Sequence, residues 1–289
     1  MIAVRAGARR AGPARRIWRR FRRDRVATVA SCVLLALAVL VALAPVLAPF
    51  AADEQDLDLI GLPDPPSLAH PFGTDPLGRD AFSRVLYGGQ VSLLVGLASA
   101  VVATAVGTTV GAAAGFYRGW TDTLLMRATD VVLSIPALPL VLLISGLVRP
   151  TVPLLVVLIG LLAWMPTARL VRSQFLTLRE RDYVEAARAL GAGSARLILR
   201  HILPNAVAPL TVSATLAVGQ AILLESAMSF FGFGVPPPTP SWGNLLNEAT
   251  PYLSSAPWLA VAPGLLIFVT VLSVNAMGDG LRDAVDARA

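Results

Sequence analysis

Six long stretches of this 289-residue chain contain no Asp, Glu, Arg or His, and they constrain its fold more than any other feature. They cover residues 26–52, 85–117, 131–148, 150–168, 202–224 and 249–278. A bilayer core about 30 Å thick is crossed by a helix of about 20 mostly apolar residues, so each stretch can hold one crossing. A further uncharged stretch, 226–247, is rich in proline, which breaks helices, and we predict a loop there. The sequence therefore predicts an all-α polytopic membrane protein with six transmembrane helices.

The composition excludes several classes of protein. Only 15% of the residues are charged, against about 25% in soluble domains. Every basic residue is arginine, and without lysine there is no phosphate-binding G-x-x-x-x-G-K-[ST] loop, so the chain is not expected to be an ATPase. With Cys32 as the one cysteine and His70 and His201 as the two histidines, we expect no metal site.

The arginines indicate the orientation in the membrane. With six crossings, 21 of the 24 arginines fall on the side of the N-terminus, and arginine gathers on the cytoplasmic side. We therefore expect both termini in the cytoplasm, with an arginine-rich tail (1–25), a first transmembrane helix (26–50), an extracytoplasmic segment (51–88), a five-helix core (89–280) and a second tail (281–289). The first apolar run exceeds the length of a signal-peptide core, so it is expected to stay as an anchor. Beside a membrane span, the arginine cluster points to anionic lipid rather than nucleic acid.

Small and ionisable residues within the spans allow more than one interpretation. Small residues recur at every fourth position in the second span, at Ser99, Ala103, Gly107, Gly111 and Gly115. Such a ridge lets helix backbones approach closely, and packing within the chain is favoured over a homodimer contact.

Charged and aromatic residues give three further expectations. Arg127 and Asp130 are spaced to neutralise one another. Glu225, near the outer end of span five, either lines a translocation path or bonds a neighbouring helix. Trp242, Tyr252 and Trp258 are expected in an aromatic belt at the outer interface.

The segment 178–205, between spans four and five, carries the clearest functional pattern. Tyr183, Val184, Ala187 and Leu190 give one apolar helical face, and Gly191 and Gly193 predict a helix stop and a turn. Ser194 is expected to cap a second helix, and Pro204 followed by Asn205 is expected to end it before span five. Ala186, Ala187 and Gly191 leave room for a partner's surface, although a membrane-surface hairpin without a partner is the alternative.

Several motifs then carry a resemblance. Glu185-Ala186-Ala187, Gly191 and His201-Ile202-Leu203-Pro204-Asn205 resemble the EAA loop of binding-protein-dependent ABC importer permeases. The histidine form is similar to the dipeptide/oligopeptide/nickel branch. Residues 70–84, 225–243 and 278–283 resemble the second permease subunit of that branch.

The resemblance implies a type I ABC importer permease fold in a bacterial inner membrane. The implied partners are a second homologous permease, two cytosolic ATPases that use ATP and Mg²⁺, and an extracytoplasmic solute-binding protein, with no cofactor bound by this chain. The implied ATPase-coupling residues are Glu185, Ala186, Ala187, Gly191, His201, Leu203 and Pro204.

Peptides are the expected cargo, and nickel complexes, glutathione and haem are the alternatives within the same architecture. An ion-coupled secondary transporter is disfavoured, because it should show ionisable residues near the membrane midplane and paired broken helices.

Overall fold

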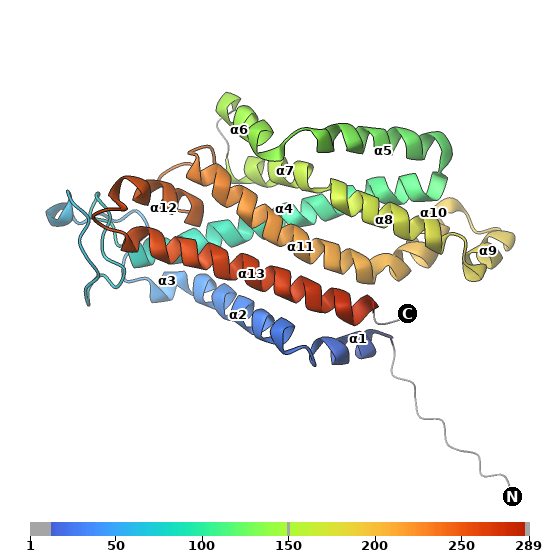
Figure 1. Ribbon diagram of the computed structural model, residues 1–289, viewed down its shortest axis with the longest axis horizontal. Helices are drawn as coiled ribbons and strands as arrows, with labels where there is room; N and C mark the ends of the chain where they lie inside the picture. The colour runs from blue at the N-terminus through green and yellow to red at the C-terminus, as the bar shows by residue number, and fades with distance from the viewer. Residues whose placement is uncertain (1–12, 149–150, 287–289) are drawn as a thin grey trace, which may run out of the picture.

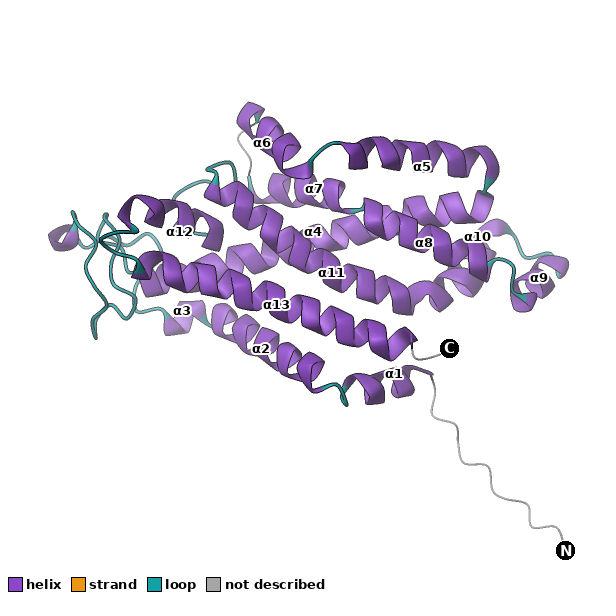
Figure 2. Ribbon diagram, viewed as in Figure 1, coloured by secondary structure: helices purple, strands orange, loops and turns teal. Residues whose placement is uncertain are grey.

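The computed structural model describes residues 13–148 and 151–286, and within them it contains helices and no strand. The only extended pairing in these ranges is two isolated bridges, Ile60 with Leu77 and Thr74 with Asp80. The predicted all-α class is confirmed (Figure 2). Residues 1–12 of the predicted tail, Arg149 and residues 287–289 lie outside the described residues.

The helices follow one another along the chain with short connections. They are α1 (Pro13–Phe21), α2 (Arg25–Ala42), α3 (Ala44–Leu47), η1 (Leu57–Leu59), α4 (Ala81–Tyr117), α5 (Gly119–Ser134), α6 (Ala137–Leu147), α7 (Val152–Ala163), α8 (Met165–Leu178), α9 (Asp182–Ala189), α10 (Ser194–Arg196), the π-helical turn η2 (Leu197–Ile202), α11 (Leu203–Phe230), α12 (Trp242–Ala249), η3 (Thr250–Tyr252) and α13 (Trp258–Asp286).

Four helices are long and apolar enough to cross a membrane without a break: α2, α4, α13 and the continuous helix Ser194–Phe230 that ends in α11. Two further crossings are bent pairs, α5 with α6 at 81° and α7 with α8 at 47°. The first bend lies at Ile135 and Pro136, whose backbones are extended, as expected before and at a proline. Counted as one span each, the bent pairs complete the predicted six.

The small-residue ridge of α4 is covered by α7 and α8, as the intramolecular interpretation predicted. A Cβ built on Gly107 would lie 2.6 Å from the carbonyl oxygen of Trp164, and one on Gly115 would lie 2.6 Å from Cβ of Phe175. Gly111 would clash with the carbonyl oxygen of Ala168. Only glycine allows the two backbones to lie this close, so the ridge fixes the position of α8 along α4.

The two ends of the bundle differ in content (Figure 1). One end carries α9, α10, α1 and the end of α13, whereas the other carries α3, α12 and the loops of residues 48–80. The first end holds most of the described arginines, as the predicted topology requires.

Two predictions about the segment after span five and its aromatic residues are wrong. The predicted loop over 226–247 is partly helical, because α11 continues to Phe230 and α12 begins at Trp242 with a capping box between Ser241 and Asn244. The prolines of this segment lie between the two helices. Trp242 is fully buried and its Nε1 donates to the carbonyl oxygen of Val85 at 3.0 Å, so it does not belong to an aromatic belt.

The predicted pair of Arg127 with Asp130 is also wrong. Asp130 accepts a hydrogen bond from Arg169 of α8 at 2.6 Å. In the same way Asp122 accepts from Arg172, at 2.5 and 2.7 Å. The acids of α5 therefore face α8, and these contacts between helices replace the contact along one helix that the sequence spacing favoured.

Replacing Gly111 by alanine should destabilise the bundle, because the added methyl meets backbone atoms of α8 that cannot move aside. We expect a loss of about 1–3 kcal/mol, the usual cost of overpacking, seen as a lower melting temperature in detergent. Gly146→Ala is the matched control, since its Cβ would meet only Phe233 Cε1 at 3.4 Å. Equal melting temperatures for the two variants would contradict the close α4–α8 contact.

Candidate functional site

The helix α9 begins and ends on local signals in its sequence. Asp182 and Glu185 lie in its first turn and Arg188 in its last, which places each charge favourably along the helix dipole. Gly191 follows with φ of +82°, a conformation that glycine adopts freely. Its N–H donates to the carbonyl of Arg188 at 2.9 Å, and the N–H of Ala192 donates to that of Ala187 at 3.0 Å. This is the Schellman pattern, and the predicted stop at Gly191 is confirmed.

One face of α9 anchors it to the bundle. Val184 is fully buried in a cluster with Phe116 of α4, Phe175 of α8 and Ile202 of η2, and Ala187 packs against the same cluster. Arg179, just before α9, lies over the Phe116 ring at 5.7 Å and donates to the Phe116 carbonyl. The helix is therefore fixed relative to α4 and α8.

The opposite face of α9 is exposed and carries the predicted coupling residues Glu185, Ala186 and Gly191. Tyr183 and Leu190, which the periodicity assigned to the buried face, are 41% and 89% exposed. Of the four residues of the predicted apolar face, Val184 and Ala187 pack against the bundle and the other two do not. What remains exposed is a surface of small and apolar side chains together with the charged side chains of Asp182, Glu185 and Arg188.

The second half of the predicted hairpin differs from expectation. Gly193, not Ser194, is the N-cap of α10, and its extended backbone (φ −69°, ψ 161°) leaves Ser194 in the first turn. Pro204 does not end the helix: it lies just after the π-helical turn, and the chain continues through it as α11. The π-helical turn η2 contains His201 and runs without a break into Leu203 and Pro204.

These residues differ in exposure. His201 and Leu203 are half-buried and Pro204 is exposed. The predicted coupling residues thus fall into two groups, one on α9 and one where η2 joins α11.

Glu225 lies at the other end of α11 and is fully buried. Its Oε1 accepts from the hydroxyl of Ser229 at 2.7 Å, and its Oε2 accepts from the hydroxyl of Ser92 on α4 at 3.0 Å. The same two hydroxyls accept backbone N–H groups, Ser92 from Trp242 at 3.1 Å and Ser229 from Val235 at 3.2 Å. The carboxyl group therefore joins α4, α11, the following loop and the start of α12.

Three buried charged side chains, Asp75, Arg79 and Arg84, form a second cluster with the half-buried Glu248. Arg84, at the start of α4, donates through Nη1 to Asp75 at 2.7 Å and to Glu248 of α12 at 2.5 Å. Arg79 donates to the same two acids, at 2.6 and 3.1 Å. The two described arginines on the predicted outer side are thus both neutralised. They hold the segment before α4 against α12.

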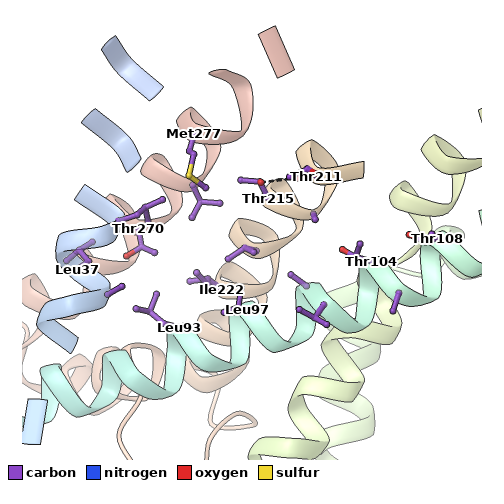
Figure 3. A pocket seen from close by; sticks show the side chains of 18 of the residues that line it. Leu37, Leu93, Leu97, Thr104, Thr108, Thr211, Thr215, Ile222, Thr270 and Met277 are labelled. Carbon is purple, nitrogen blue, oxygen red and sulfur yellow. Dashed lines mark hydrogen bonds between the residues drawn. The ribbon is translucent and has the colours of Figure 1, made fainter. Parts of the chain in front are cut away.

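A groove of about 830 Å³ lies between α2, α4, α11 and α13 (Figure 3). Its lining side chains are apolar or threonine, and none is charged. The hydroxyls of Thr104, Thr108 and Thr270 are buried without a hydrogen-bond partner, which is uncommon because buried polar groups are normally paired. Glu225 is not among the lining residues. Of the two interpretations of Glu225, this geometry favours a bond to a neighbouring helix over a place in the path.

Most of these polar partners are not signalled by the sequence. Ser229 is four residues after Glu225 on one helix, a spacing that could have revealed it. Ser92 and Glu248 lie more than 100 residues from the groups they contact, and no local pattern signals such pairs.

Comparison with known proteins shows which family the chain belongs to. Residues 107–289 match the model of the family described as the binding-protein-dependent transport system inner membrane component. The chain belongs to this family. Residues 12–66 match the N-terminal transmembrane domain of oligopeptide transport permease C. The chain is therefore the membrane-embedded permease subunit of an ABC importer, with the type I permease fold, and the family is not itself an ATPase.

Similar permeases are found in other bacteria. A protein of Brucella suis biovar 1, provisionally named a peptide permease, is 42% identical over 96% of this chain and 92% of its own length. A counterpart of Brucella ovis with the same provisional name is 41% identical over 96% of this chain and 92% of its own. The glutathione transport system permease protein GsiD of Escherichia coli O6:K15:H31 is 41% identical over 96% of this permease and 91% of its own length.

Removing the acceptors of Glu225 should weaken the permease. We expect Glu225→Leu to lower its stability by about 1–3 kcal/mol, the cost of buried donors left unpaired, measured as thermal unfolding in detergent. Glu225→Gln retains an acceptor and should cost less, with assembly and transport close to wild type. A Gln variant that assembles normally but does not transport would instead place the charge in the transport path.

Proposed function

We propose that this permease imports peptides and that α9 is the helix through which separate ATPase subunits drive it. The proposed complex holds this chain, a second homologous permease, two cytosolic ATPases that bind ATP and Mg²⁺, and an extracytoplasmic solute-binding protein. The observation that carries the proposal is the exposed small-residue face of α9, held rigidly at the arginine-rich end of the bundle.

The exposed face suits a protein partner. Ala186 and Gly191 leave space above the helix, and no atom lies within 4 Å of a Cβ built on Gly191. Leu190, 89% exposed, offers apolar area that a partner would remove from water. Glu185 beside them can pair with a partner's cation. Docking of a cytosolic ATPase here would place this end of the bundle, and both chain termini, in the cytoplasm.

Movement of α9 can reach the membrane through a continuous path. Val184 fixes α9 to a cluster shared with Ile202 of η2, and η2 continues into α11. Through Thr211, Thr215 and Ile222, α11 lines the groove. A shift of the ATPases would therefore be transmitted through this cluster to α11, one wall of the groove, as alternating access between two states requires.

The groove itself suits a peptide. Unpaired hydroxyls on α4 and α13 can donate to or accept from an amide group, and the apolar remainder of the lining tolerates varied side chains. The absence of charge from this lining means that no fixed ion would hold a charged cargo in place. We infer that the groove is this subunit's part of the translocation path.

Ala186→Asp should separate the ATPases from the permease, because an unpaired carboxylate buried at a packed contact costs on the order of several kcal/mol. Each 1.4 kcal/mol is about tenfold in affinity, so we expect ATPase binding to fall about 100-fold or more. Binding is measured by co-purification, and coupling by substrate-stimulated ATP hydrolysis in vesicles.

Ala195→Asp adds the same charge to an exposed alanine of α10 and is the matched control. Gly191→Ala is a less direct test, because φ of +82° strains any other residue there whatever docks. Gly193→Ala adds the same methyl group nearby, where there is open space and φ is −69°. It therefore tests the added methyl without backbone strain. Normal ATPase binding and coupling in Ala186→Asp would reject α9 as the docking helix.

Cells without this permease should lose uptake of labelled peptides, and the double variant Thr104→Val, Thr108→Val should restore only part of it. The hydroxyls removed are the unpaired ones, so the effect should fall on uptake and not on ATPase binding. Thr109→Val is the control, because its hydroxyl already donates to the carbonyl of Ala105 at 2.8 Å. Retained peptide uptake with lost uptake of glutathione, nickel complexes or haem would identify a different cargo.

A further inference from the structure

A second groove of about 710 Å³ lies at the arginine-rich end of the bundle, between α1, α2, α11 and α13. Its lining residues are Ile17, Trp18, Phe21, Ser31, Pro204, Asn205, Val207, Ala208, Thr211, Thr215, Met277, Leu281 and Val285. This second groove shares Thr211, Thr215 and Met277 with the first groove. Unlike in the first groove, each hydroxyl among these lining residues has a hydrogen-bond partner.

The polar side chains of this second groove are already hydrogen bonded within their own helices. The hydroxyl of Ser31 donates to Ala27 at 2.7 Å, and the amide of Asn205 donates to His201 at 2.7 Å. Thr211 and Thr215 donate to the carbonyls four residues before them, at 2.8 and 2.9 Å. The hydroxyls of the wall therefore have no spare donor, and of these groups only the second amide N–H of Asn205 stays available. The wall thus suits a hydrocarbon chain better than a peptide.

The helix α1 covers one side of this groove with apolar side chains. Ile17 and Phe21 pack against Ala27 of α2 and against α13. Trp18, 60% exposed, stacks on Phe21 with ring centroids 6.1 Å apart and lines the groove. An aromatic side chain in this position, with an apolar ring and a polar N–H, is typical of the boundary between lipid tails and headgroups.

Arginines surround the same helix on its exposed side. Arg19, Arg22, Arg23 and Arg25 are exposed. The nearby carboxylate of Asp24 is occupied by the backbone N–H groups of Val26 and Ala27, at 2.9 and 3.2 Å, as the N-cap of α2.

The facing end of α13 also carries acids. Asp279 and Asp283 are exposed there, and they do not match the number of arginines. The helix α1, which lines the groove, and its junction with α2 thus keep a positive balance, with four exposed arginines against Asp24, Asp279 and Asp283.

We propose that this groove binds an anionic phospholipid, with an acyl chain along α11 and α13 and the phosphate on Arg19, Arg22 and Arg23. Charge complementarity selects this occupant, because a zwitterionic lipid offers the same chain without net charge. A transmembrane helix of another subunit would fill the apolar wall but would leave the arginines without a counter-charge. The site does not depend on which cargo the importer carries.

Quenching of Trp18 by brominated lipid tests the site. The importer containing the full-length chain is placed in nanodiscs with brominated phosphatidylglycerol or brominated phosphatidylcholine at equal mole fraction. Subtracting the signal of Trp18→Phe isolates Trp18 from the other tryptophans. We expect phosphatidylglycerol to quench Trp18 several-fold more strongly at low mole fraction.

Two sets of variants locate the lipid. Ala208→Phe should fill the groove and remove the preference, whereas Val29→Phe, on an exposed position of α2 outside the lining, should keep it. The triple variant Arg19→Gln, Arg22→Gln, Arg23→Gln should reduce quenching by phosphatidylglycerol to that by phosphatidylcholine. Arg188→Gln with Arg196→Gln, exposed on α9 and α10, should not.

Three results would overturn the proposal. Equal quenching by the two lipids in the wild type would mean ordinary lipid contact with no selective site. Weak quenching by both would mean that another subunit covers the groove. A preference that survives the arginine variant would show that headgroup charge is not recognised there, and this arm holds even if Ala208→Phe does not fold.

Discussion

The close contact of α4 with α8 is the constraint on which the rest of the structure depends. In lipid, helices gain little from burying apolar surface against one another, and close packing of backbones takes over that role. Gly107, Gly111 and Gly115 bring α8 against α4 along several turns, and the same pair supplies Phe116 and Phe175, which receive α9. The position of α9 below the bundle is therefore set by glycines inside it.

Polar groups within the bundle differ between two sites, the buried cluster around Glu225 and the groove lined by Thr104, Thr108 and Thr270. Around Glu225 every hydroxyl has a partner, and the result is a fixed joint between α4, α11 and α12. In the central groove the hydroxyls of Thr104, Thr108 and Thr270 have none. A satisfied network rigidifies a structure, whereas unsatisfied groups retain the capacity to bind. The contrast separates what holds this permease together from what is free to interact.

Much of the fold could be predicted from the sequence, because the signals were local. Uncharged stretches gave the six crossings, and the spacing of small residues gave the buried face of α4. Gly191 gave the end of α9, since its role depends on one backbone angle. The EAA-like residues pointed to α9 and the turn after it, although their role in coupling stays a prediction.

Two of the errors have a tertiary contact as their physical cause, and the third is a local helix cap that follows the prolines. Asp130 pairs with Arg169 across two helices, and spacing along one helix could not reveal this. Trp242 was assigned to an interface by its residue type, but it is buried by the backbone of α4. Proline in the segment after α11 was read as a sign of a loop throughout, while Ser241 and Asn244 start a helix immediately after it.

The π-helical turn between α9 and α11 has a consequence for how this permease can change over evolution. Most connections between helices tolerate added or lost residues. Here the hydrogen bonds of Leu197–Ile202 reach back five residues instead of the four of an α-helix, and the turn continues directly into α11. A further residue gained there would exceed what the π-helical turn absorbs and would rotate everything before it by about 100°, so that Val184 would turn out of its cluster. Insertions into this segment are therefore restricted as strictly as insertions into a transmembrane helix, and it lies in the first part of the continuous helix Ser194–Phe230.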